Sequence, residues 1–216
     1  MSPIVGCFCL GLALGQRMTA EEHLASPPEG ASISPDKKWE YKCVEYGPGS
    51  CAPGIAQAGT TKVVLDLDQD VNGTESSEAQ VVWAPDSQRF GFNYSPPHAH
   101  HTTYKTAAFY QLRAEKWETL RSPEDELVKL ARELLPKRLH KSNDELIPDI
   151  VKVRSWPDAG TAVLLSAWHP WEYSSHSNQL SAAFLLTLKF DDNGDWKVVK
   201  KHRLSEKEIE KLGTED

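Results

Sequence analysis

Five of the eight histidines of this chain fall in two short segments. They are His98, His100 and His101 within residues 95–104, and His169 and His176 within residues 169–180. Imidazole is a common ligand of zinc, copper and nickel, so one hypothesis is a metal site that serves a small metal-dependent enzyme. The other is a solvated loop, because no Asp, Glu or Cys stands beside the first group at a ligand-like spacing. The histidines by themselves leave both hypotheses open.

Aromatic residues accompany the second histidine group. Trp168 and Trp171 flank His169, and Tyr173 follows them. Rings of this kind offer apolar area together with hydrogen-bonding groups, which is typical of a binding surface. We therefore predict one surface from eight residues: His98, His100, His101, Trp168, His169, Trp171, Tyr173 and His176. The other five tryptophans stand in or beside strand-like segments, which indicates a structural role.

The sequence contains none of the short motifs that mark common catalytic sites. It has no Gly-x-Ser-x-Gly, no His-Glu-x-x-His and no glycine-rich phosphate loop. We predict no catalytic residue and no cofactor. Side-chain oxygens recur at every second position in Asp66, Asp68 and Asp70 and in Asp191, Asn193 and Asp195, but neither stretch has the Gly and Glu of a calcium loop. The pair Asn193-Gly194 is typical of a type I′ hairpin turn.

Length and composition point to a globular protein. The chain has 216 residues, 39% of them hydrophobic, which is enough for one domain with a sizeable core. The net charge of −7 provides no basic excess for a phosphate backbone, so nucleic acid is not an expected partner.

The start of the chain indicates export. Residues 4–15 form an apolar run that is too short to span a bilayer and ends in a small-x-small pattern, Ala13-Leu14-Gly15. We interpret residues 1–15 as a signal peptide and residues 16–32 as a linker. Cys43 and Cys51 remain after cleavage, separated by a turn-rich spacer. An oxidising compartment favours a disulfide between them, and their spacing is not that of a C-x-x-C metal or redox motif.

A Pro-Asp pair recurs three times, each time before a strand-like segment. The pairs are Pro35-Asp36, Pro85-Asp86 and Pro157-Asp158, and the strands are expected at 39–44, 89–94 and 161–168. A loop follows each strand, at 46–60, 95–104 and 169–180, and then a second strand, at 62–67, 107–112 and 183–188. Proline presets φ for a tight turn, and the Asp carboxylate can accept backbone N–H bonds as the chain reverses. If the units stack alike, the three loops emerge on one face.

A helix is predicted between the second and third units. Ser122 is a good N-cap, and leucines and an alanine from Leu127 to Leu135 fall on one face, which should pack on a sheet. A shorter terminal helix begins at Ser205 with a capping box to Glu208.

The recurring unit resembles the WD40-like propeller repeats of the TolB type, which occur in exported bacterial proteins. The resemblance covers about residues 33–203 in three copies, whereas closed propellers typically have about 4 to 8 blades. It implies a mainly β fold of stacked, four-stranded, antiparallel, blade-like sheets. We expect one domain over residues 33–216, with a helical insert at 122–140 and a short C-terminal helix.

These observations lead to one expectation about function. The chain is expected to be a secreted or periplasmic, non-enzymatic binding or scaffold module that uses loops on one face. Its partner would be a protein or a cell-envelope ligand, and the chain is not expected to span a membrane. Whether an oligomer completes the sheet stack is left open. The alternative is the metal-dependent enzyme that uses the loop with His98, His100 and His101.

Overall fold

The computed structural model describes residues 32–47, 50–97, 104–135, 147–168 and 182–212. Its strands form three antiparallel sheets, in which hydrogen-bonded neighbours follow the order of the chain. Sheet A contains β1 (Trp39–Gly47), β2 (Ser50–Gln57) and β3 (Val63–Asp66). Sheet B contains β4 (Glu75–Trp83), β5 (Arg89–Ser95), β6 (Thr106–Arg113) and β7 (Lys116–Thr119). Sheet C contains β8 (Ile150–Asp158), β9 (Thr161–Trp168), β10 (Ala182–Phe190) and β11 (Trp196–Arg203).

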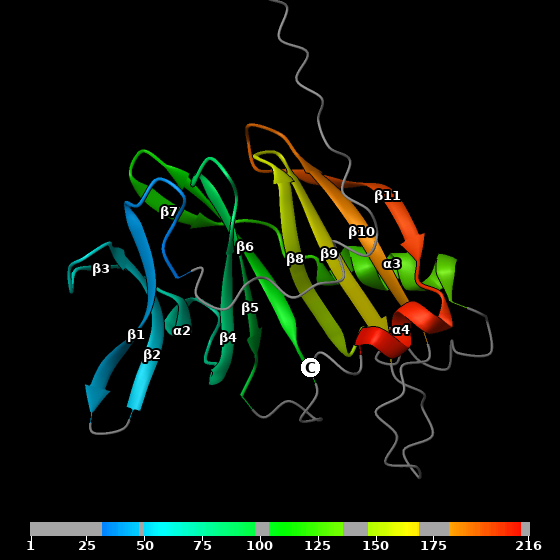
Figure 1. The fold of residues 1–216 in the computed structure, drawn as a ribbon, viewed down its shortest axis with the longest axis horizontal. Helices are drawn as coiled ribbons and strands as arrows, with labels where there is room; N and C mark the ends of the chain where they lie inside the picture. The colour runs from blue at the N-terminus through cyan, green and yellow to red at the C-terminus, as the bar shows by residue number, and fades with distance from the viewer. Residues whose placement is uncertain (1–31, 48–49, 98–103, 136–146, 169–181, 213–216) are drawn as a thin grey trace, which may run out of the picture.

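The described residues form an open stack of sheets. Figure 1 shows sheet B between sheets A and C, with α3 (Glu124–Leu134) behind sheet C and α4 (Glu206–Leu212) at its lower end. A one-turn helix, α2 (Leu67–Asp70), follows β3. The mainly β fold of stacked antiparallel sheets, with a helical insert and a short C-terminal helix, is confirmed.

The three Pro-Asp turns are built in the same way. The carboxylates of Asp36, Asp86 and Asp158 each accept the backbone N–H of the residue two positions further on, at 3.1, 3.0 and 2.8 Å. The carbonyl of that same residue then accepts an N–H from the second strand after the turn, or from the residue just past the end of that strand. The donors are Ala58, Leu112 and Phe190, all at 2.8 Å. The predicted role of the Pro-Asp pair is therefore confirmed in every unit.

The first unit differs from its expected strand plan. Residues 46–60 are expected to be a loop, but they contain the end of β1 and the whole of β2, and the segment at 63–66 is the third strand. One face of β2 carries only small residues, Ala52, Gly54 and Ala56, and all three are buried. Such small residues leave no apolar alternation for a sequence pattern to detect. In the described residues sheet A has three strands where four were expected.

Turn geometry corrects a second expectation. Gly194 has φ of 74° and its N–H bonds to the carbonyl of Asp191 at 3.1 Å, whereas Asn193 is not in the left-handed region. The connection is thus a turn followed by a left-handed glycine, not the predicted type I′ turn. The two-residue turn with both φ values positive lies instead between β6 and β7, at Ala114 (44°) and Glu115 (65°).

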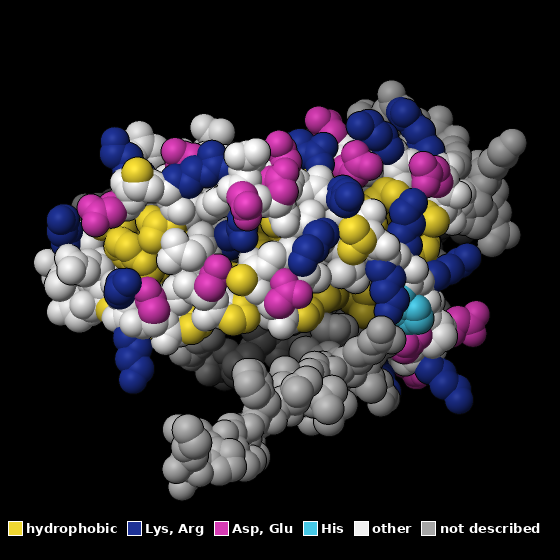
Figure 2. Space-filling model, turned by 90° about the horizontal axis from the view of Figure 1, so that it is seen from above, with side chains coloured by type: hydrophobic (Ala, Val, Ile, Leu, Met, Phe, Trp, Pro, Cys, Tyr) yellow, Lys and Arg dark blue, Asp and Glu magenta, His cyan; other side chains and the backbone are white. Residues whose placement is uncertain are grey.

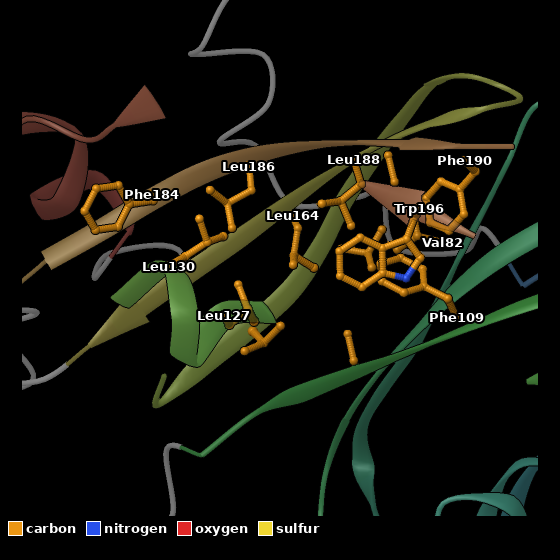
Figure 3. Close-up of a cluster of buried hydrophobic side chains, with 14 of the residues drawn as sticks. Val82, Phe109, Leu127, Leu130, Leu164, Phe184, Leu186, Leu188, Phe190 and Trp196 are labelled. Atoms are coloured by element: carbon orange, nitrogen blue, oxygen red, sulfur yellow. The ribbon is translucent and has the colours of Figure 1, made fainter. Parts of the chain in front are cut away.

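Sheet B contributes to a core on each of its faces. One core lies between sheets A and B and contains Ile55, Phe90 and Phe92, all fully buried. The other lies between sheets B and C and continues under α3. Figure 3 shows Val82 and Phe109 of sheet B meeting Leu188, Phe190 and Trp196 of sheet C.

Helix α3 packs on sheet C as the leucine pattern predicts. Leu127, Leu130 and Ala131 are 1%, 3% and 0% exposed, and Figure 3 places the two leucines under β9 and β10. The helix begins one residue later than expected: Pro123 stands at the N-cap position, and the Ser122 hydroxyl before it accepts the N–H of Glu124 at 3.3 Å. The helix ends at Leu134, and Leu135 is extended, as the residue before a proline prefers.

The terminal helix also begins as expected. The Ser205 N–H and hydroxyl donate to the Glu208 carboxylate at 2.7 and 2.6 Å, which is the predicted capping box. Ile209 of α4 packs against apolar residues on the outer face of sheet C, including Leu165 and Leu185.

Sheets B and C are joined by buried polar groups as well as by the core. The side-chain amide of Asn93 donates to the Val153 carbonyl at 3.0 Å and accepts the Val153 N–H at 2.8 Å. Arg89 donates to the carbonyls of Ala159 and Asp191 at 3.1 and 2.8 Å. Gly91 lies beside Val153, because a Cβ at position 91 would fall 2.5 Å from Val153 Cγ2.

Replacing Leu130 with Ala should lower the free energy of unfolding by about 2–5 kcal/mol, because the side chain is buried and would leave a cavity. Lys129→Ala on the exposed side of the same helix is the control and should change it by less than about 0.5 kcal/mol. Urea unfolding of both variants measures the difference. Equal effects would mean that the leucine face does not carry the packing.

Gly91→Ala should lower the free energy of unfolding by about 1–3 kcal/mol, because the new methyl group overpacks the contact with Val153. Gly160→Ala is the matched control, since the nearest atoms to its Cβ would lie at ordinary distances of 3.5–3.7 Å. Thermal unfolding compares the two variants. A neutral Gly91→Ala would contradict the close approach of sheets B and C.

Candidate functional site

The strands that lead into the predicted loops end on the same side of the stack. In Figure 1, β1, β5 and β9 all run from the Pro-Asp turns at the top toward the lower end. Strands β5 and β9 lead directly into the two histidine segments. We call this side of the molecule the loop end.

Backbone hydrogen bonds join sheets B and C at the loop end. Lys105, just before β6, forms a parallel bridge with Ile150: its N–H donates to the Asp149 carbonyl at 2.9 Å, and its carbonyl accepts from Val151 at 2.8 Å. The Asp149 N–H donates to the Ala167 carbonyl at 2.9 Å. One strand, β8, therefore separates the ends of the two histidine segments, a span of about 10 Å at ordinary strand spacing.

Of the eight predicted surface residues, the structure describes Trp168. This side chain is 4% exposed and packs edge-on against Phe184, with ring centroids 5.9 Å apart. It therefore contributes to the core that sheet C and α3 share, and it is the last residue of β9. The other seven lie outside the described residues: His98, His100, His101, His169, Trp171, Tyr173 and His176.

A group of tyrosines and carboxylates borders the first histidine segment. The Tyr104 hydroxyl donates to Glu124 Oε1 at 3.3 Å, and the Thr106 hydroxyl reaches the same oxygen at 3.5 Å. Burial, reinforced by the charges of Glu124 and Asp70, raises the pKa of Tyr94 to about 12. Burial and Glu124 also raise the pKa of Tyr104. Both phenols stay neutral at physiological pH, and Tyr104 donates a hydrogen bond to the exposed Glu124 carboxylate.

Sequence reasoning did not identify this tyrosine group. Glu124 is readily interpreted as an acidic residue that complements the start of a helix. Its contact with Tyr104 spans 20 positions, and the segment between β7 and α3 must return beside β6 before the two can meet. The Leu120 N–H, which bonds to the Phe109 carbonyl at 2.8 Å, shows that return. No short sequence pattern predicts this return of the chain.

The alternating acidic residues have structural partners. Asp66 caps α2 by accepting the Gln69 N–H at 3.0 Å, and Asp68 accepts the Thr74 N–H at 2.9 Å. Asp70 accepts the hydroxyls of Tyr110 and Thr119 at 2.8 and 2.9 Å. Within the described ranges, no three His, Cys, Asp or Glu side chains are grouped so that they could hold a metal.

Searches against known protein families, curated proteins and solved structures found no match to this chain. In the part of the chain that the structure describes, no helix is long and apolar enough to cross a membrane. The site must therefore be interpreted from its own geometry.

Glu124→Gln should lower the pKa of Tyr94 and Tyr104 toward the ordinary value of 10.0, because the variant removes a negative charge that opposes phenolate formation. Phenolate absorbance during alkaline titration measures the change. Glu126→Gln on the same helical turn is the control and should leave the titration unchanged.

The raised pKa values also predict the pH dependence of stability. In the unfolded chain Tyr94 loses its proton near 10.0, before the folded protein does at about 12. The neutral form is then favoured by folding, so its contribution is complete below pH 10 and is lost as the pH rises through about 12. A smaller alkaline loss of stability in Glu124→Gln is expected, and an identical loss would contradict the assignment.

Proposed function

We propose that the protein is an exported, non-enzymatic binding or scaffold module that contacts its partner through the loop end. The observation that carries this proposal is the Lys105–Ile150–Ala167 backbone connection. It joins the residues next to the two histidine segments, Lys105 and Ala167, through one intervening strand, which supports a shared surface. A module that recognises a partner needs such a fixed support under variable loops.

The chemistry of the loop end favours a polar partner. The described border offers neutral phenol donors and the Glu124 carboxylate. The sequence of the adjoining segments adds imidazoles, Trp171 and Tyr173. Aromatic and hydrogen-bonding groups in this combination suit a protein or a cell-envelope ligand, and we propose no cofactor.

Export and an oxidised cysteine pair belong to the same proposal. The β1–β2 register sets Cys43 opposite Pro53 and Cys51 opposite Glu45, so the cysteines occupy diagonal positions on neighbouring strands. The disulfide, the signal peptide and the secreted or periplasmic location all remain predictions.

The TolB-type resemblance supports the same function by analogy. The three equivalent Pro-Asp turns and the repeated strand order agree with a blade-like unit. Proteins of that architecture commonly present loops to partners. The parallel bridge between sheets B and C is a local feature of this chain, and it is the stronger argument.

Site-specific photo-crosslinking tests the proposal. A photoreactive phenylalanine analogue is placed at Trp171, in the segment that follows β9 in the sequence, and, as the control, at Glu115 in the β6–β7 turn. In the producing cells, we expect covalent adducts with one partner from position 171 and none from position 115. Adducts from position 115 alone, or equal adducts from both, would contradict a binding loop end.

The enzyme alternative is tested on the same preparation. A non-enzymatic module should contain no stoichiometric transition metal after export. Zinc or copper bound at one equivalent, and lost in a His98→Ala, His100→Ala variant, would favour the metal-dependent enzyme instead.

A further inference from the structure

The interface between sheets A and B is dominated by aromatic rings. Trp39 of β1 meets Trp117 of β7 edge-on, with ring centroids 5.7 Å apart. Trp83 lies 5.8 Å from Trp117 and 5.0 Å from Phe90. Trp83 and Trp117 are 8% and 9% exposed, so the rings exclude water. We call these three tryptophans and Phe90 the aromatic cluster.

The indole N–H groups of the aromatic cluster are buried without hydrogen-bond partners. This holds for Trp39, Trp83 and Trp117 among the described residues. A buried donor that has lost water and gained no acceptor destabilises the closed arrangement. Three such donors at one interface weaken that interface in particular.

At the interface between sheets B and C, by contrast, the indole N–H groups of two tryptophans have hydrogen-bond acceptors. The Trp156 N–H donates to the Val82 carbonyl at 3.0 Å, and the Trp196 N–H donates to the Arg121 carbonyl at 3.1 Å. The Arg121 guanidinium also lies 4.2 Å from the centre of the Trp196 ring. Each of these two indole groups therefore donates to a carbonyl in a different part of the fold, Trp156 to β4 and Trp196 to the segment between β7 and α3.

The side-chain hydrogen bonds that join the sheets also differ between the two interfaces. Asn93, Arg89 and Gln111 are at most 8% exposed and bond to the backbone of sheet C or its turns. Sheet A is linked to sheet B by the Tyr41 hydroxyl on the Ala79 carbonyl at 3.1 Å and by the Asp36 N–H on the Ser87 hydroxyl at 2.9 Å. In the part of the chain that the structure describes, fewer side-chain bonds thus join sheets A and B than join sheets B and C.

We propose that sheet A opens from sheet B as one unit while sheets B and C stay together. Opening breaks the Tyr41 and Asp36 bonds, and it returns the three indole donors to water. Their hydration offsets part of the apolar contact that is lost, so this opening is favoured over opening between sheets B and C. The opened form exposes the aromatic face of sheet B, with Phe90 and Trp83 at its centre.

Hydrogen exchange of the full-length chain, followed by mass spectrometry, tests the proposal. Amides of β1 and β2 should be protected at least about tenfold less than those of β9 and β10, the factor expected from one unpaired buried donor or more. They should also exchange as a group. Equal protection of sheets A and C under the same conditions would overturn the proposal.

Two matched pairs of variants identify the cause. Trp117→Phe removes an unpartnered N–H and keeps an aromatic ring, so protection of sheet A should rise severalfold, whereas Trp196→Phe removes a satisfied bond and should not raise it. Tyr41→Phe should lower protection in sheet A alone, and Trp156→Phe should lower it between sheets B and C. If Trp117→Phe and Trp196→Phe both reduce protection everywhere, the unpartnered donors do not govern opening and the proposal fails.

Discussion

The structure depends on the contact between Asn93 and the backbone of Val153. The pairing of β8 with β9 shifts register between Val153 and Ser155, which interrupts the regular ladder at this point. The Asn93 amide supplies both a donor and an acceptor to Val153, as a neighbouring strand would. Because Asn93 is 4% exposed, these bonds form away from water, where leaving either group unpaired would be costly.

The same contact sets the distance between sheets B and C. Gly91 lies two positions before Asn93 and meets the Val153 side chain, so the sheets approach more closely than a Cβ at position 91 would allow. The close approach brings Arg89 to the turns of sheet C at one end and Lys105 to Ile150 at the other. The positions of Lys105 and Ala167, next to the two histidine segments in the sequence, therefore follow from packing in the middle of the interface.

Electrostatic features at the loop end follow from the chain's return between β7 and α3. That return carries Glu124 to Tyr104 and Thr106, which lie near the end of the first histidine segment. The insertion of α3 between the second and third units thus has two effects. Its leucine face covers sheet C, and its first residue supplies a carboxylate to Tyr104 and Thr106 at the start of β6.

Much of the local structure could be predicted from the sequence because its causes are local. The three Asp carboxylates bond two residues away, the Ser205–Glu208 box closes within three, and the leucine spacing of α3 defines its buried face. The alternating aromatic residues of β5 likewise indicate a strand, but the expectation that it is only half-buried is wrong, because sheets A and C cover both of its faces. Each of these signals depends on neighbours in the chain, so a single sequence contains it.

Only the tertiary structure decided the contacts that join distant segments. Asn93 and Val153 are 60 positions apart, and Arg89 and Asp191 are 102 apart. The strand β2 was not predicted because its small residues give no apolar alternation. Trp168, predicted to belong to a binding surface, is part of the core. The physical reason is that burial and hydrogen bonding between sheets depend on where strands from different units meet, and no short pattern in the chain encodes that position.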